Sequence, residues 1–124
     1  MSDTSAPEQL VTLDRRDDGI AVVSLSHGKV NALCVDLLDQ LHAMALELTE
    51  HTPRAVVVTG SAKVFAAGAD ISEFAERGGH EPFAISPPER VAEIGGAFLG
   101  ALNAVAAIPC PTIAAVAGVA LGGG

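Results

Sequence analysis

The sequence predicts an α/β protein in which consecutive strand-and-helix units stack on one core. Short runs rich in β-branched residues, at 20–25 and 55–59, are typical of strands. Two longer segments, 35–48 and 88–107, carry apolar residues at helical spacing. With a further strand at 112–117, strands and helices alternate along the chain, which favours a layered protein over an all-helical one.

The first half of the chain predicts a hairpin, a helix and a third strand. Strands at 11–13 and 20–25 meet at Asp17-Asp18-Gly19, and Asp-Gly is a strong signal of a tight hairpin turn. The helix at 35–48 has an apolar stripe that predicts core positions: Leu37, Leu38, Leu41, Met44, Ala45 and Leu48. The valine-rich run at 55–59 predicts a strand buried on both faces.

The second half predicts a short helix, a loop, a long helix and a strand. The chain leaves the sheet at 65–70, and a short helix at 71–77 and a loop rich in glycine and proline at 78–88 follow. A proline suits the start of the helix at 88–107. The apolar stripe of that helix is Val91, Ile94, Phe98, Leu102 and Val105. The strand at 112–117 is expected to be buried.

No charged residue occurs between Ile94 and Gly124, so a membrane span is a rival interpretation of this run. Pro109 and Pro111 divide the run, however, and neither part reaches the roughly 18 apolar residues that a bilayer requires. We therefore expect a buried helix followed by a buried strand, and no membrane partner.

Length and composition limit the class of protein. A chain of 124 residues, of which 49% are hydrophobic, holds one domain at most and can bury a core. Residues 1–10 are polar and acidic without the features of a secretory signal, which predicts a disordered lead-in before a domain at 11–124. A net charge of −8 and an aromatic content of 3% oppose nucleic-acid binding.

The cysteines and histidines predict neither a metal site nor a nucleophile. Cys34 and Cys110 lack CxxC spacing and a neighbouring histidine, and they are typical of reduced thiols in a cytoplasmic protein. The histidines are scattered, and we expect them to be structural: His27, His42, His51 and His80.

Two segments rich in glycine and alanine carry most of the functional information. The first is Phe-Ala-Ala-Gly-Ala-Asp-Ile at 65–71, and the second, at 111–124, ends in three glycines. Each predicts a buried strand that runs into a turn of small residues, where backbone N–H groups are bare. Two such turns side by side would offer two donors to one oxyanion. Small residues permit the close approach that backbone donors need.

With Lys29-Val30-Asn31-Ala32-Leu33 upstream, these segments stand in the order found in the crotonase (enoyl-CoA hydratase/isomerase) superfamily. From about Val11 to Gly124 the chain resembles the N-terminal half of that family. The resemblance implies a crotonase-like spiral of stacked ββα units, truncated before the later turns and the C-terminal helical region. It also implies a lyase or isomerase of fatty-acid metabolism that acts on acyl-CoA thioesters, with no cofactor besides the CoA of the substrate. A homo-oligomer, trimer or hexamer, is expected of the full-length protein.

The resemblance further implies individual site residues. The backbone N–H groups of Ala69 and Gly123 would form the oxyanion hole. Contacts with CoA and the acyl group would come from Lys29, Val30, Ala32, Ala67, Ala69, Asp70, Ile71, Leu121 and Gly122. Ser72 stands where many relatives carry a lysine, which weakens the case for a phosphate contact there. The other candidate cations, each also explained as an ordinary surface charge, are Lys29, Arg54 and Lys63.

Family hydratases use two glutamates that follow the triple glycine, and neither position exists within these 124 residues. The isolated chain is therefore expected to be inactive as a hydratase. The nearest carboxylates are expected to be solvated or to cap backbone groups: Asp70, Glu73, Glu76 and Glu81.

Two alternatives stay open. A dinucleotide-binding domain requires GxGxxG after a strand, and Gly122 and Gly124 supply only the first two glycines. The other alternative is a catalytically dead fragment or split subunit that needs a partner chain, because its last strand would otherwise be an unpaired edge.

Overall fold

A computed structural model of the chain describes residues 8–74 and 87–124. Its elements are β1 (Val11–Arg15), β2 (Ile20–Leu25), α1 (Val35–Glu50), β3 (Ala55–Thr59), β4 (Val64–Ala66), the 3-10 helix η1 (Ile71–Phe74), α2 (Pro88–Ala106), β5 (Thr112–Ala115) and β6 (Val119–Ala120). The predicted α/β order is confirmed, and β4 and β6 are additions to it. Parts of the predicted elements, at 75–77 and 78–86, lie outside the described residues, as do Glu76, His80 and Glu81.

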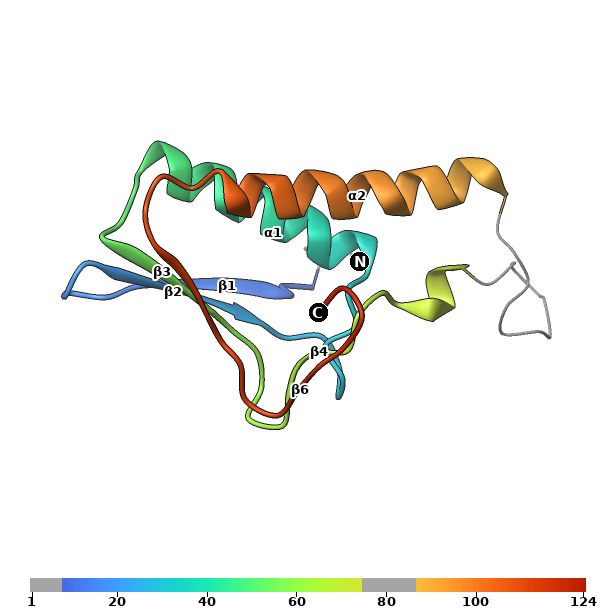
Figure 1. The fold of residues 1–124 in the computed structure, drawn as a ribbon, viewed down its shortest axis with the longest axis horizontal. Coiled ribbons are helices and arrows are strands. Elements are labelled where there is room, and N and C mark those ends of the chain that lie inside the picture. The colour runs from blue at the N-terminus through green and yellow to red at the C-terminus, as the bar shows by residue number, and fades with distance from the viewer. Residues whose placement is uncertain (1–7, 75–86) are drawn as a thin grey trace, which may run out of the picture.

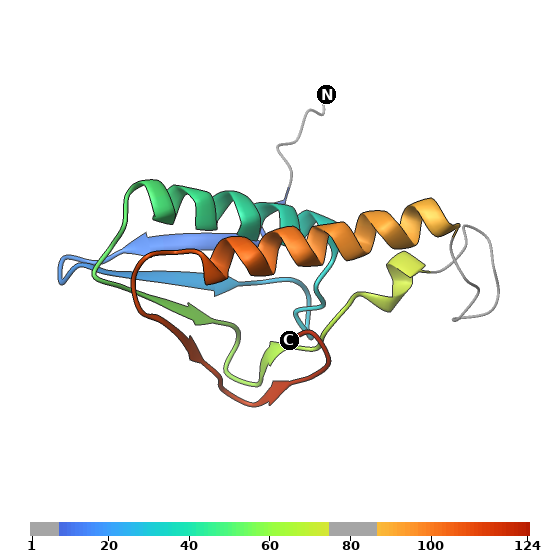
Figure 2. The same ribbon diagram turned by 45° about the horizontal axis from the view of Figure 1, so that its top comes forward.

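The main sheet has the strand order β1-β2-β3-β5. β1 and β2 are antiparallel, and the other pairs are parallel. The predicted hairpin turn joins β1 to β2, where Gly19 has a φ of 88° and the N–H of Ile20 donates to Asp18 Oδ1 at 3.0 Å. β4 and β6 form a separate parallel pair, which continues from the C-terminal ends of β3 and β5 (Figures 1 and 2).

Helices α1 and α2 lie side by side over one face of the main sheet (Figures 1 and 2). The predicted stripe of α1 is confirmed, because Leu37, Leu38, Leu41, Ala45 and Leu48 are all buried, and Met44 is half-buried. These side chains belong to one apolar cluster with the residues that β2 directs to the same face: Ala21, Val23 and Leu25. The core is therefore the layer between α1 and the sheet.

The predicted stripe of helix α2 is confirmed in part. Ile94 is buried, and Phe98 and Val105 are half-buried against the core. Val91 and Leu102, however, are 40% and 48% exposed, and the other buried residues of the helix are Ala101 and Ala104. The two helices approach closely at Gly100, where an added Cβ would lie 3.0 Å from a nitrogen of the His42 ring of α1. Small residues permit this approach, so they occupy the contact and the larger apolar residues of the predicted stripe fall partly outside it.

Among the residues that the structure describes, the helices cover one face of the main sheet (Figures 1 and 2), and this overturns two predictions. β3 is not buried on both faces, because Val56 is fully buried but Val57 is half-buried. The strand predicted at 112–117 ends at Ala115, and β5 is exposed along its length, with Ile113 53% exposed. Among the described strands, β5 lies at the edge of the main sheet and pairs with β3 alone. The expectation of a buried strand after α2 was wrong.

The path of the chain agrees with one expectation and corrects another. As expected, the chain leaves the main sheet at 65–70, and Phe65 and Ala66 belong to β4, which pairs with β6 outside that sheet. Leu10, which was assigned to the lead-in, is 4% exposed and belongs to the core, and its N–H donates to Gln40 Oε1 at 2.7 Å. Residues 1–7 of the predicted lead-in lie outside the described residues.

Across residues 8–74 and 87–124, no helix combines the length and the hydropathy that a membrane crossing requires.

Candidate functional site

The parallel pairing of β4 with β6 brings the two glycine- and alanine-rich segments together. Ala66 pairs with Ala120, and parallel strands run in the same direction, so the residues that follow these two alanines lie side by side. The N–H of Leu121 donates to Ala66 O at 3.0 Å, and the N–H of Gly124 donates to Leu121 O at 2.8 Å. The second bond closes the turn that follows β6.

The backbones of the two turns are in direct contact. Gly68 has a φ of 95°, and a Cβ added there would lie 2.8 Å from Leu121 O and 3.4 Å from Gly123 N. A Cβ on Gly124 would collide with Ala66 O. The contact therefore requires glycine on both sides, which explains the composition of the two segments.

Ala69 lies opposite Leu33 in an isolated parallel bridge. The N–H of Leu33 donates to Gly68 O at 2.7 Å, and the N–H of Asp70 donates to Leu33 O at 3.3 Å. Because the neighbours of Ala69 make both bonds, its own N–H points to the other side of the chain. Within the part of the chain that the structure describes, the N–H groups of Ala69 and Gly123 have no hydrogen-bond acceptor. Both groups can therefore donate to the oxygen of a ligand.

The loop between β2 and α1 lies against the first turn. The N–H of Ala67 donates to Val30 O at 3.0 Å, so the predicted contact residues Lys29, Val30 and Ala32 adjoin those at 67–70. Three of the predicted contact residues are exposed apolar side chains: Val30 is 50% exposed, Ile71 63% and Leu121 55%. The structure gathers these positions, and their contact with CoA stays a prediction.

The polar candidates separate into different places. Arg54 lies at the β1–β2 turn, where its N–H donates to Gly19 O at 2.9 Å, so it is not brought to the glycine turns. Lys63 precedes β4, and its carbonyl accepts from the N–H of Val119 at 3.3 Å. Asp70 accepts at Oδ1 from the N–H and the hydroxyl of Ser72, at 3.1 and 2.6 Å. Asp70 is thus a capping group, as expected.

Asn31 has a structural role that the sequence did not reveal. It is 3% exposed and has a φ of 49°, a conformation that asparagine tolerates. Its Oδ1 accepts from the N–H of His27 at 2.8 Å, and its Nδ2 donates to Leu25 O at 3.1 Å and Phe65 O at 3.2 Å. One side chain therefore ties the end of β2 to β4. The sequence signal for this role was the position of Asn31, a polar amide within an otherwise apolar Val-Asn-Ala-Leu run.

An apolar cavity of about 190 Å³ lies between the sheet, the two helices and the second turn. Its lining includes Leu25, Leu33, Phe65, Leu102, Val105 and Gly123. Such a lining suits hydrocarbon and disfavours a charged group.

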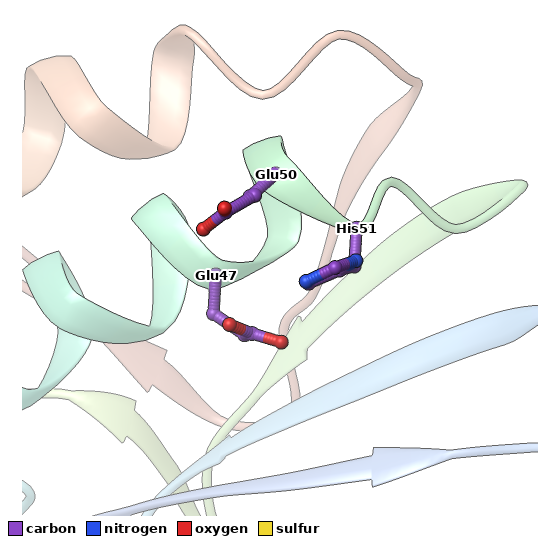
Figure 3. Close-up of side chains that lie close together, drawn as sticks. All are labelled: Glu47, Glu50 and His51. Carbon is purple, nitrogen blue, oxygen red and sulfur yellow. The ribbon is translucent and has the colours of Figure 1, made fainter.

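Three side chains of metal-ligating type gather at the opposite end of α1 from these turns (Figure 3). The ligand atoms of Glu47, Glu50 and His51 lie within 4.8 Å of one another, and all three residues are exposed. Glu47 also pairs with Arg15 at 3.9 Å, and Arg15 donates to His51 O at 3.0 Å. Exposed acidic groups at this spacing are common without an ion, so we assign no metal site to them.

Cys34 caps α1, because its Sγ accepts from the N–H of Leu37 at 3.4 Å. Burial raises the pKa of the Cys34 thiol, the hydrogen bond from Leu37 opposes this rise, and the negative charge of Glu73 adds to it. A thiol with a raised pKa is neutral at physiological pH and is a poor nucleophile. Cys34 is therefore structural.

Comparison with known sequences identifies the class of protein to which this fold and these paired turns belong. Residues 15–124 match the profile of the family described as enoyl-CoA hydratase/isomerase, and the chain belongs to this family.

Individual relatives agree with this. The "Probable enoyl-CoA hydratase echA8" of Mycobacterium tuberculosis is 37% identical over 114 residues, which cover 90% of this chain and 40% of the relative. An enoyl-CoA hydratase from Bacillus anthracis matches with a TM-score of 0.78 at 31% identity, over 94% of this chain and 43% of that one. DspI of Pseudomonas aeruginosa matches with a TM-score of 0.82 at 27% identity, over all of this chain (100%) and 44% of that one.

The chain thus spans about 40% of the length of the curated relatives it matches. The prediction of a partial crotonase fold is confirmed.

Proposed function

We propose that the protein acts on acyl-CoA thioesters and that the N–H groups of Ala69 and Gly123 together stabilise negative charge on the thioester oxygen. One observation carries the proposal: two N–H groups without acceptors, among the described residues, lie on turns whose backbones touch at Gly68. Membership of the enoyl-CoA hydratase/isomerase family supports the choice of substrate.

The chemistry follows from where the charge forms. When a base removes a proton beside a thioester carbonyl, or water adds one carbon further on, an enolate-like state places charge on the carbonyl oxygen. Donors that already point at that oxygen need no reorganisation, and the loss of one typically costs about 3–4 kcal/mol of transition-state stabilisation. The bridge to Leu33 holds the first of these donors in place.

The remaining surfaces suit the other parts of an acyl-CoA. The apolar cavity beside Gly123 can accept acyl carbons. The half-exposed Val30 and the exposed Ile71 and Leu121 offer apolar contacts to CoA, and Lys29 offers a charge to its phosphates. We propose that the whole protein serves fatty-acid metabolism in the cytoplasm as a homo-oligomer.

Hydration needs acid and base groups in addition to the oxyanion donors. The described carboxylates nearest the turns are already occupied: Asp70 by Ser72, and Glu73 by Val35 and Arg90. We therefore propose that residues 1–124 supply oxyanion stabilisation and that this segment alone does not hydrate crotonyl-CoA.

Infrared difference spectroscopy of a bound thioester tests the oxyanion proposal directly. Crotonyl-CoA labelled with ¹³C at the carbonyl is titrated with the protein, and two hydrogen bonds should move the C=O stretch to lower frequency than in water. Gly68→Ala, which pushes the turns apart, should reduce the shift. Gly96→Ala is the matched control, because an added Cβ there has no neighbour within 4 Å. A bound thioester whose stretch equals that in water would refute the proposal.

A second candidate function is that of a subunit completed by another polypeptide. The exposure of apolar residues along 111–124 favours it: Ile113, Val116, Val119 and Leu121 are each at least 42% exposed. The same titration distinguishes the two candidates, because such a subunit would leave the C=O stretch unchanged until the partner polypeptide is added.

A further inference from the structure

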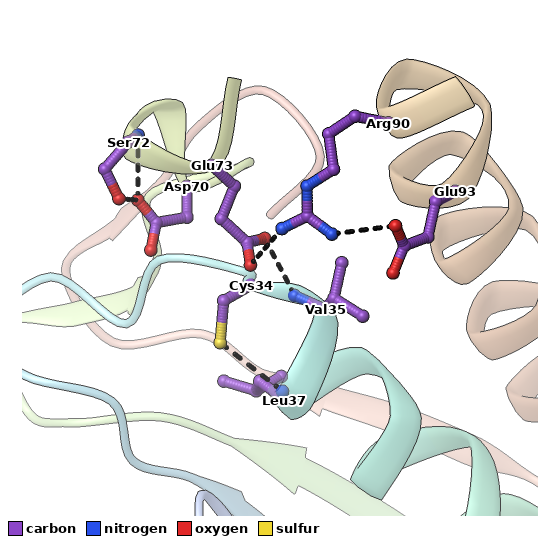
Figure 4. A network of polar contacts seen from close by, with 8 residues as sticks. All are labelled: Cys34, Val35, Leu37, Asp70, Ser72, Glu73, Arg90 and Glu93. Carbon is purple, nitrogen blue, oxygen red and sulfur yellow. Dashed lines mark hydrogen bonds and ion pairs between the residues drawn. The ribbon is translucent and has the colours of Figure 1, made fainter. Parts of the chain in front are cut away.

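The carboxylate of Glu73 joins three segments of the chain (Figure 4). Glu73 lies in η1, and its Oε1 accepts from the N–H of Val35, the first residue of α1, at 2.8 Å. Its Oε2 accepts from Nη2 of Arg90, in the first turn of α2, at 3.2 Å. The side chains of Glu73 and Arg90 are 18% and 32% exposed, so solvent screens this pair only in part.

Glu73 supplies a helix cap that Cys34 supplies only weakly. The first N–H groups of a helix have no partner within it, and the sulfur of Cys34 is a weak acceptor for one of them. A carboxylate near a helix N-terminus is both a strong acceptor and a favourable charge. The charge of Glu73 is also felt at Cys34, where it contributes to the raised pKa of the thiol. The contact with Val35 is therefore a substantial attachment of η1 to α1.

The same attachment closes a short loop of contacts around Ala69. On one side, the bridge to Leu33 holds Gly68 and Asp70. On the other side, the N–H of Glu73 donates to Asp70 O at 3.0 Å, and the side chain of Glu73 returns to Val35, two residues beyond Leu33. Ala69 is held from both directions against the segment that begins α1.

We propose that Glu73 is a positioning residue that sets the direction of the Ala69 N–H. The catalytic meaning of this role rests on the proposed function, in which that N–H donates to the thioester oxygen. Arg90 orients the Glu73 carboxylate from α2. Glu93 pairs with Arg90 at 3.0 Å, and within residues 8–74 and 87–124 it makes no hydrogen bond or ion pair with η1 or α1.

Amide hydrogen exchange and chemical shifts in the ¹⁵N-labelled chain test the positioning role without any need for activity. Glu73→Ala should speed exchange of the Asp70 N–H about tenfold, because a charge-assisted hydrogen bond is lost, and should move the Ala69 amide resonance. Glu73→Gln keeps an acceptor for Val35 and should restore most of the protection. Glu93→Gln is the matched control, and it should leave both amides as in the wild type.

The outcome that overturns the proposal is specific. If Glu73→Ala alters Val35 alone and leaves Ala69 and Asp70 unchanged, Glu73 is only a cap of α1. Should Glu73→Ala fail to fold, Arg90→Gln decides the same question, since it removes the ion pair with Glu73 and should alter the Ala69 resonance; an unaltered resonance in Arg90→Gln would then overturn the proposal.

A second readout connects the role to the substrate. In the infrared titration, Glu73→Ala should reduce the shift of the thioester C=O stretch by a larger factor than it raises the dissociation constant of CoA itself. If the wild-type protein gives no shift, the proposed function fails, while the exchange data still decide whether Glu73 positions Ala69.

Discussion

Gly68→Ala tests the contact between the two turns. In the wild type, Gly68 has a φ of 95°, and the new methyl group would lie 2.8 Å from Leu121 O and 3.4 Å from Gly123 N. Both neighbours are backbone atoms, which cannot rotate away as the end of a side chain can. The substitution therefore adds a strained backbone conformation and a close contact at one position.

The two effects can be given separate magnitudes. An alanine in the left-handed region costs about 1–2 kcal/mol, and overpacking of a filled site costs about 1–3 kcal/mol. The free energy of unfolding should therefore fall by about 2–5 kcal/mol, a large fraction of the stability of a small domain. Gly28→Ala isolates the first effect, because Gly28 has a φ of 60° and no neighbour within 4 Å of the added Cβ.

Urea denaturation followed by circular dichroism measures these changes through the midpoint and the slope. We expect Gly68→Ala to be the least stable variant and Gly28→Ala to be intermediate. Gly96→Ala, in the open middle of α2, should gain about 1 kcal/mol from helix propensity. The reasoning is refuted if Gly68→Ala costs no more than Gly28→Ala, because the turns would then not be in contact.

Two further predictions concern buried groups. Asn31→Ala should lower the free energy of unfolding by about 1–3 kcal/mol, because Leu25 O and Phe65 O lose a donor. The control Asn103→Ala, at an exposed position of α2, should change the free energy of unfolding by less than about 0.5 kcal/mol. Equal effects of the two substitutions in urea denaturation would contradict the role of Asn31. The raised pKa of Cys34 means that the folded chain holds the thiol proton more tightly than the unfolded chain. The resulting stability is complete below the ordinary value of 9.0 and is lost as pH rises above it. Urea midpoints measured from about pH 8 to about pH 10 should fall less steeply in Cys34→Ser than in the wild type or in Cys110→Ser, and parallel slopes would count against this.

The sequence predicted the elements whose signals are local. The Asp-Gly turn specified the β1–β2 hairpin, and the apolar stripe of α1 matched its buried face because α1 packs against a sheet with room for large side chains. The stripe of α2 misled at Val91 and Leu102, which are exposed, since the helix approaches α1 closely at the small residue Gly100 and buries Ala101 and Ala104.

Features that depend on distant partners could not be predicted in the same way. β4 and β6 have only three and two residues, too few for a periodic pattern, and each forms because the other is present. The glycines of the turns pointed to a close backbone approach, and the partners of Gly68 became visible only in three dimensions. The hydrogen bonds of Asn31 and Glu73 likewise join segments that lie far apart in the sequence.

The separation of Ala69 from Gly123 along the chain has a consequence for how the proposed oxyanion hole would form. Neither strand of the β4–β6 pair has a second neighbour in the described sheets, and a pair of short strands is weak by itself. The last step of folding is therefore expected to be the meeting of these two strands, after the hairpin and α1 have formed from local contacts. If the proposed function is right, a thioester that contacts both turns would bind only when β4 and β6 are paired, and its binding would therefore stabilise that pairing against partial opening.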